Sequence, residues 1–438
     1  MTETSPKSNL VRLITNAIQN VDTILSIVLA LVAAGISLFG GKTDFAIAAT
    51  AGALTLISIS ILRDRNAREQ LLTLVHDVRF DLSQLLRQTP ADKFFSKKTS
   101  EQGIISNGVN EIVIIQETGR LIAETHRREI VNFLNNGGHV RWISVMQTPM
   151  LTELMAFRNA NLSSPQIMAT RMNSGIEMIE LLAKEVNISA SNFVLRFLPY
   201  PVDITAIFRD PYNLNERQRE CLIRLQGFRL TYDDKLDFYI NGLSSKETFE
   251  LYRRQMESMW RSCTKCILLT GEPAIGKTTL LEKVVNQLQQ STALKIDGFI
   301  THDVRNEAGD RIGFEAKTLK DKRSGVLALK KGDGSYELNQ ETMNHIIKPV
   351  LEEGIASAEL LVIDEIGPIQ LQDEEFSNTI NRALNKQNLS IIGTVALKGH
   401  PYLQKIRQHY RTEIVNVTEL NREQLVKDLV NEFLDRKL

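Results

Sequence analysis

The stretch Ile-Leu-Leu-Thr-Gly-Glu-Pro-Ala-Ile-Gly-Lys-Thr occupies residues 267–278 and decides the expected fold. Its first four residues are mostly apolar and predict a short buried strand. The next eight, Gly271–Thr278, have the spacing G-x-x-x-x-G-K-T of a phosphate-binding loop. An amphipathic segment, Thr279–Gln289, follows and predicts a helix. This order of strand, loop and helix indicates an α/β fold that binds nucleotide. An accidental match to the loop pattern would lack the flanking strand and helix.

The chemistry of phosphate binding explains the residue types in this loop. Glycines allow backbone N–H groups to turn inward around phosphate oxygens, and the following helix adds the positive end of its dipole. We expect Lys277 to reach the β- and γ-phosphates and Thr278 to offer its hydroxyl to Mg²⁺. The predicted nucleotide-binding residues are Gly271, Glu272, Pro273, Ala274, Ile275, Gly276, Lys277, Thr278 and Thr279.

A second motif, which carries two acidic residues, completes the predicted site. Four apolar residues, 360–363, predict a buried strand that ends in Asp364 and Glu365. Asp364 is expected to hold Mg²⁺, with Thr278 as the other protein ligand. Glu365 is expected to orient and deprotonate the attacking water, although an ordinary solvated glutamate is the alternative. The adjacent acid favours hydrolysis over phosphate transfer to another acceptor.

Five motifs in order resemble the nucleoside-triphosphatase family first known from thermophiles, which is called the cancer-related nucleoside triphosphatase family in animals. They are Gly298–Arg305, Arg311–Phe314, Gly334–Tyr336, Asp364–Gly367 and the set Thr418, Asn421 and Arg422. The resemblance covers roughly Lys265 to the C-terminus. It implies Mg²⁺-dependent hydrolysis of nucleoside triphosphates with loose base selectivity, so that ATP or GTP is the expected substrate.

Two departures from the family pattern affect the predicted catalytic details. Asp303 stands where the family usually has Glu, and Thr394-Val395-Ala396 lacks the His that often follows this Thr-Val. Arg305 and Arg311 are candidates for stabilising charge on the transferred phosphate. The alternative for each arginine is structural pairing with a nearby acid, such as Asp303.

Composition bounds the rest of the chain. The 438 residues include 52 Lys+Arg and 52 Asp+Glu, so a net charge of zero carries no signal for nucleic-acid binding. Hydrophobic residues make up 43% and charged residues 24%, which is ordinary for globular proteins. The 3 cysteines exclude a disulfide scaffold. Cys263 and Cys266 allow a metal or redox interpretation, but structural thiols are the favoured one because no second cysteine pair exists.

The strongest hydrophobicity lies in residues 23–62. Thr23–Gly41 and Phe45–Leu62 carry no charge, and each approaches the length of about 20 residues that spans a bilayer. The flanking arginines follow the second run, so the positive-inside rule predicts a two-span cell-membrane protein with both termini cytoplasmic. Lipid is then a partner through residues 23–62. A cleaved signal peptide and a buried helical hairpin are the alternatives.

A heptad-like stripe follows the hydrophobic runs. It consists of Leu71, Val75, Val78, Leu82 and Leu85. The stripe predicts either a helical neck that pairs protomers into a homo-oligomer or an amphipathic helix on its own domain.

Residues between the neck and the nucleotide motifs predict a separate α/β unit. Strands are expected at 111–116, 139–145, 193–198 and 203–208, and helices at 120–135, 151–159 and 166–186. This layout faintly resembles the phospholipase D-like fold. That family's catalytic His-x-Lys pattern is absent, and His139-Val140-Arg141 is its nearest match. A ligand-binding or scaffold role is therefore expected instead.

The sequence as a whole predicts an α/β protein with five parts. These are a cytoplasmic tail (1–22), a transmembrane helical hairpin (23–62), a helical neck (63–94), an α/β middle domain (95–255) and a P-loop NTPase domain (256–438). The expected function is a membrane-anchored nucleoside triphosphatase coupled to sensing, signalling or defence. The alternatives are a nucleotide-controlled oligomerising switch or membrane effector, and a P-loop phosphotransferase.

Overall fold

The computed structural model describes residues 109–159, 164–186, 192–230 and 235–434. They contain two mixed β-sheets, both within the compact unit Phe94–Leu438. The first sheet is built by the middle domain and the second by the C-terminal domain. Each sheet contains a parallel part and an antiparallel part.

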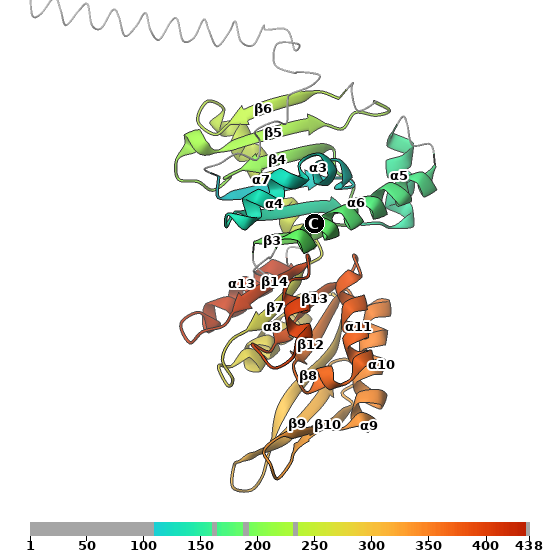
Figure 1. The fold of residues 1–438 in the computed structure, drawn as a ribbon, viewed down its shortest axis with the longest axis vertical. Helices are drawn as coiled ribbons and strands as arrows, with labels where there is room; N and C mark the ends of the chain where they lie inside the picture. The colour runs from blue at the N-terminus through green and yellow to red at the C-terminus, as the bar shows by residue number, and fades with distance from the viewer. Residues whose placement is uncertain (1–108, 160–163, 187–191, 231–234, 435–438) are drawn as a thin grey trace, which may run out of the picture. The chain divides into compact units, whose positions relative to one another are not determined.

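The first sheet has the strand order β3-β2-β1-β4-β5-β6 (Figure 1). Strands β1 to β3 are parallel, and β4 to β6 extend the sheet in antiparallel fashion. The strands are β1 (Glu111–Gln116), β2 (His139–Val145), β3 (Phe193–Leu198), β4 (Ile204–Arg209), β5 (Glu220–Leu225) and β6 (Asp237–Asn241). The helices are α3 (Arg120–Thr125), α4 (Arg127–Asn135), α5 (Pro149–Arg158), α6 (Pro165–Glu185) and α7 (Lys246–Ser262).

The strands and helices expected in this region are confirmed within a residue or two, with one exception. The single helix expected over 120–135 is divided at His126, where the backbone leaves helical geometry at φ −108° and ψ 15°. The His126 ring is buried and lies 3.0 Å from the Glu129 carboxylate. This break and the local side-chain contact are not visible in the apolar periodicity, which runs through both helices.

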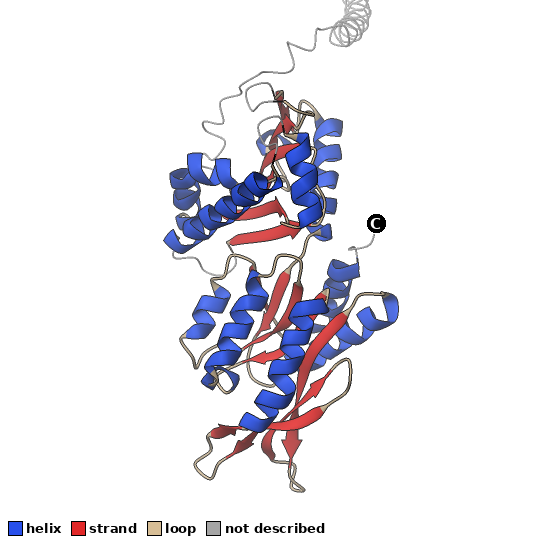
Figure 2. Cartoon of the chain, turned by 90° about the vertical axis from the view of Figure 1, so that its right-hand side faces the viewer, coloured by secondary structure: helices blue, strands red, loops and turns tan. Residues whose placement is uncertain are grey.

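The second sheet has the order β11-β10-β9-β8-β12-β13-β7-β14, and helices cover its strands (Figure 2). The five strands β8, β12, β13, β7 and β14 are parallel. The strands are β7 (Cys266–Thr270), β8 (Ile296–Arg305), β9 (Arg311–Thr318), β10 (Ser324–Lys330), β11 (Tyr336–Leu338), β12 (Leu360–Ile366), β13 (Ser390–Val395) and β14 (Thr412–Asn416). The helices are α8 (Lys277–Ser291), α9 (Gln340–Thr342), α10 (Lys348–Ser357), α11 (Glu374–Asn385), α12 (Tyr402–Arg407) and α13 (Arg422–Leu434).

Alternation along β7 sorts its side chains into two cores, because successive residues of a strand face opposite sides of a sheet. Ile267 and Leu269 join the cluster that α8 and α13 complete. Cys266 and Leu268 join the cluster of α10 and α11. A strand buried on both faces reads as a continuous apolar run, which is why the sequence predicted it.

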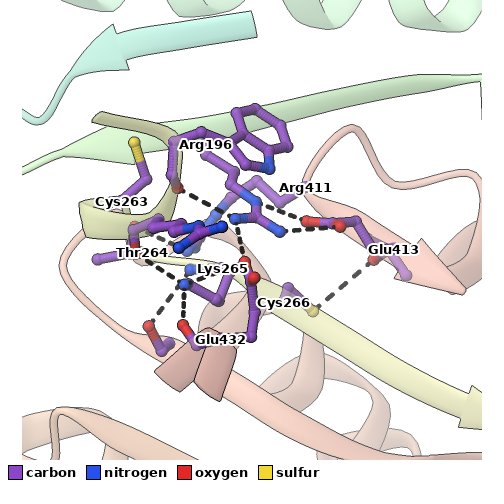
Figure 3. A network of polar contacts seen from close by, with 12 residues as sticks. Arg196, Cys263, Thr264, Lys265, Cys266, Arg411, Glu413 and Glu432 are labelled. Atoms are coloured by element: carbon purple, nitrogen blue, oxygen red, sulfur yellow. Dashed lines mark hydrogen bonds and ion pairs between the residues drawn. The ribbon is translucent and has the colours of Figure 1, made fainter. Parts of the chain in front are cut away.

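The edge strand β3 of the first sheet is covered by backbone from the C-terminal domain. Leu195 N–H donates to the Tyr410 carbonyl at 2.7 Å, and Thr264 N–H donates to the Phe197 carbonyl at 2.8 Å. Figure 3 shows the polar side chains that surround this contact, with Arg196 of β3 at their centre. The unpaired edge of a sheet is thereby satisfied within the chain.

The predicted membrane anchor requires a correction. Within the four described ranges, no helix is both long and apolar enough to cross a bilayer. The hairpin expected at 23–62 and the neck expected at 63–94 lie outside the described residues. The described fold is a mixed α/β one with a P-loop C-terminal domain. The transmembrane part of the predicted fold class and the predicted cell-membrane location are therefore not supported; they rested on the lengths of two apolar runs and on the basic residues that flank them.

Candidate nucleotide-binding site

The phosphate-binding loop connects the carboxyl end of β7 to the start of α8. Gly271 and Gly276 have φ angles of 150° and 98°, a region that glycine enters without steric cost. A Cβ atom at Gly271 would lie 2.7 Å from the Val417 carbonyl oxygen. The first glycine of the motif thus allows the loop to pack against the segment that follows β14.

Lys277, the first residue of α8, folds back over this loop. Its ammonium donates to the carbonyl oxygens of Gly271 and Glu272, both at 3.0 Å. These acceptors are neutral, whereas hydrogen bonds between an ammonium and an anionic phosphate are stronger. The lysine therefore holds a position from which phosphate oxygens can replace the carbonyls.

Asp364 lies at the carboxyl end of β12 and is fully buried. Its carboxylate accepts hydrogen bonds from the Thr394 hydroxyl at 2.6 Å and from the Thr301 hydroxyl at 3.2 Å. The Thr278 hydroxyl also bonds to it. The two predicted metal ligands, from motifs far apart in sequence, thus lie in contact. Burial raises the pKa of Asp364, and these hydrogen bonds oppose that effect.

Glu365, the next residue, has the electrostatics of a base. Burial, followed by the charge of Asp364, raises the pKa of its carboxyl above the ordinary value. The positive charges of Lys277 and Arg311 act on the same carboxyl and lower its pKa. A carboxylate with a raised pKa accepts a proton more readily, which suits proton removal from water near neutral pH.

The two candidate arginines are both paired with Asp303. Its carboxylate lies 2.6 Å from a guanidinium nitrogen of Arg305 and 3.3 Å from one of Arg311. Arg305 also donates to the Gly309 carbonyl at 2.9 Å, within the β8–β9 turn. Of the two, Arg311 is the one whose charge acts on Glu365. The aspartate at the family's glutamate position therefore organises both side chains, and their catalytic roles stay predictions.

Sequence reasoning did not assign roles to several neighbours of the site. Thr301 of β8 and Thr394 of β13 orient Asp364 from the two strands that pair with β12. Arg422 lies beside the loop, because its guanidinium is 3.9 Å from the position of a Cβ at Gly276. Asn421 holds the turn before Arg422 through hydrogen bonds with Thr418 N–H at 2.8 Å and the Asn416 carbonyl at 2.9 Å. The signal for these residues was their membership in the family motifs.

The donor set fits Mg²⁺. Thr278 and Asp364 offer hard oxygen ligands, and Mg²⁺ typically takes few protein ligands while keeping waters and phosphate oxygens. Among the described residues, no group of three or more His, Cys, Asp or Glu side chains could hold a metal ion by itself. The cysteines Cys221, Cys263 and Cys266 are buried free thiols, as expected for structural residues.

Comparison with known proteins identifies relatives of the C-terminal domain. A model of the family described as NTPase matches residues 266–430. The cancer-related nucleoside-triphosphatase homolog of Mus musculus is 32% identical over 180 residues, 37% of this chain and 94% of that protein. Nucleoside-triphosphatase THEP1 of Aquifex aeolicus is 30% identical over 176 residues, 38% of this chain and 97% of that protein. The solution structure of a human cancer-related nucleoside triphosphatase is 32% identical, with 38% and 96% coverage and a TM-score of 0.34.

Proposed function

Since the chain belongs to the NTPase family and its C-terminal domain is a nucleoside-triphosphatase, we propose that this domain hydrolyses ATP or GTP to the diphosphate and phosphate. Thr278 and Asp364 hold Mg²⁺ in this proposal, and Glu365 is the general base. The observation that carries it is the contact between the Thr278 hydroxyl and Asp364, with the raised pKa of Glu365 beside it.

Each side chain has one task in the reaction. The backbone N–H groups of Gly271–Thr278 and the start of α8 bind the phosphates, and Lys277 exchanges its carbonyl partners for phosphate oxygens. Bound Mg²⁺ supplies polarisation of the phosphate oxygens. Glu365 accepts a proton from the attacking water. Arg311 stabilises charge on the transferred phosphate once it exchanges Asp303 for phosphate oxygen.

The test measures phosphate release by the full chain with MgATP and MgGTP. Glu365→Gln is expected to lower kcat by about 10²- to 10⁴-fold while nucleotide binding is kept, because only the proton acceptor is lost. Glu337→Gln is the matched control, since Glu337 lies exposed on β11 and pairs with Lys331. Turnover of Glu365→Gln within twofold of the wild type contradicts the assigned base.

The contacts of Arg196 support a further role, in which the middle domain senses a signal and influences hydrolysis. Its guanidinium makes a two-bonded ion pair with Glu413 of β14, at 2.7 and 2.9 Å. It also donates to Glu432 of α13 at 2.6 Å (Figure 3). Helix α13 packs on α8, which begins at Lys277. Strand β14 pairs with β7. A change in β3 can therefore act, through β14 and α13, on β7 and α8, the two elements that flank the phosphate-binding loop.

A second buried cation, Lys265, shares Glu432 with Arg196 and adds to the contacts between the two domains. Lys265 is fully buried at the start of β7 and donates to the backbone carbonyls of Arg261 at 2.8 Å and Glu432 at 2.5 Å. Burial and the Arg196 charge lower the pKa of Lys265 to about 8, against the opposing effect of Glu432. Removing one partner of a buried ion pair strongly destabilises the fold, because the other charge is left uncompensated. The packing of β3, β7 and α13 therefore depends on every member of this network.

A further inference from the structure

A cavity of about 370 Å³ opens in the middle domain, separate from the nucleotide site. It lies at the carboxyl end of β1, with Gln116 and Glu117 in its wall. The strand order reverses at β1, because β2 and β3 lie on one side of it and β4 to β6 lie on the other. In open α/β sheets, ligands bind beyond the carboxyl ends of strands at the point where the strand order reverses. The size is also that of a small-molecule pocket.

Polar side chains from the antiparallel strands line the other side of this cavity. Arg224 makes a buried, two-bonded ion pair with Asp237, both bonds at 2.7 Å. Gln226 donates to the Thr205 hydroxyl at 2.6 Å, and its amide oxygen accepts from Lys235. Burying so many polar groups costs free energy, and perturbed groups that converge in a pocket are typical of binding sites.

The cavity lining carries more positive than negative charge, with Arg120, Arg171, Arg224 and Lys235 against Glu117 and Glu124. Asp237 pairs with Arg224, while Glu117 and Asp203 pair with Arg158. Lys235 has no carboxylate of a described residue within ion-pair distance. Burial and the charges of Arg158 and Arg224 lower the pKa of Lys235 to about 8.

Two more side chains that line the cavity have polar atoms available to a ligand. Arg171 of α6 lines the cavity and forms no ion pair with a described residue. The side-chain oxygen of Gln116 is buried without a hydrogen-bond partner in the described structure. An unsatisfied buried acceptor destabilises the fold, and a hydrogen-bond donor on a ligand removes that cost.

We propose that this cavity binds a small organic oxyanion, a phosphate ester or a carboxylate, whose charge is held by Lys235 and Arg171. A hydroxyl of the same ligand donates to Gln116. The anion supplies the negative charge that the pocket lacks, and charge-assisted hydrogen bonds are the strong ones in such sites. Binding at this site can be tested separately from the proposed hydrolysis, since its lining residues all belong to the middle domain.

The experiment follows acetylation of individual lysines in the full chain at pH 8, read by peptide mass spectrometry. Glycerol 3-phosphate, malate and orthophosphate are the probes, and exposed Lys246, which pairs with Glu216, is the internal control. A probe at ten times its Kd is expected to slow Lys235 acetylation about 10-fold and to leave Lys246 unchanged, because occupancy sets the reactive fraction. Protection by glycerol 3-phosphate or by malate distinguishes the phosphate ester from the carboxylate.

A variant tests the hydroxyl contact. Gln116→Leu removes the unsatisfied oxygen without removing a cation, so it is expected to weaken protection by the hydroxylated probes and to keep protection by orthophosphate. Lack of protection by all three probes overturns the proposal. Equal slowing of Lys235 and Lys246 also overturns it, since that result indicates adventitious anion association only.

Discussion

The Thr394 hydroxyl donates a hydrogen bond of 2.6 Å to Oδ1 of Asp364. Thr394 belongs to β13, which lies between the strand that leads into the phosphate-binding loop and the strand that ends in the acidic pair. It also belongs to the segment in which the sequence departs from the family pattern. The sequence keeps Thr394, which orients the predicted metal ligand Asp364. The histidine that is absent from this segment is not needed for that contact.

The Thr394–Asp364 bond predicts a metal-affinity defect. Thr394→Val keeps the shape but removes the donor, so we expect the Mg²⁺ concentration for half-maximal phosphate release to rise about 10- to 100-fold. Thr270→Val is the matched control, because the Thr270 hydroxyl is buried without a partner in the described structure and its loss is expected to be nearly neutral for stability. An unchanged Mg²⁺ requirement in Thr394→Val contradicts the orienting role.

The pKa of Glu365 predicts the acid side of the pH–rate profile. The base must be deprotonated, so hydrolysis falls as the pH drops through its pKa. Burial and the Asp364 charge raise this pKa, which places the fall above the ordinary glutamate value of 4.5. The measurement is kcat/KM against pH for the full chain at saturating Mg²⁺. A profile that stays flat down to the ordinary value is inconsistent with Glu365 as the base.

The same shift predicts a pH-dependent stabilisation. A carboxyl whose folded pKa is raised destabilises the fold above that pKa and does not do so below its unfolded pKa. Glu365→Gln is therefore expected to raise the apparent melting temperature by about 2–4 °C at pH 8, for a gain of about 1 kcal/mol. The difference from wild type should disappear as the pH falls below 4.5, the ordinary value. A gain that is independent of pH points to another cause.

The two arginines that share Asp303 should differ in their effects. Arg311→Ala is expected to lower kcat about 10²-fold, as for loss of one charge-stabilising donor, and Arg305→Ala much less. Removing Arg311 also removes a charge that lowers the Glu365 pKa, so the acid limb should move to higher pH. Arg305→Ala is the matched control for that limb. Equal loss of activity in both variants favours a purely structural role through Asp303.

Arg196 offers a test of coupling between the domains. Arg196→Met leaves Glu413 without its buried partner and leaves Glu432 with Lys265 alone, so we expect a loss of about 3 kcal/mol in stability. Arg127→Met is the control, because Arg127 forms a more exposed pair with Glu185 and its removal should cost about 1 kcal/mol or less. Titration of MgATP in the folded variant then reads KM. An unchanged KM and kcat contradict an influence on the nucleotide site.

Local pattern was sufficient where one element decides the outcome. The strands at 111–116, 139–145 and 193–198 follow from apolar runs, and the loop at 271–278 follows from its glycines and lysine. The antiparallel strands β5 and β6 were not predicted, because their outward residues interrupt the apolar pattern. The cavity of the middle domain was equally unforeseen, since its walls come from both halves of the sheet.

Local motifs were sufficient to predict nucleotide binding, because the phosphate-binding loop and the Asp364–Glu365 pair each lie within a few consecutive residues. The side chains that surround them are set by tertiary packing. Thr301 and Thr394 reach Asp364 because their strands, β8 and β13, pair with β12 on its two sides. Arg196 meets Glu413 and Glu432 across more than two hundred residues of sequence separation. Side-chain partners of this kind depend on how strands and helices pack, and no local spacing in the chain encodes them.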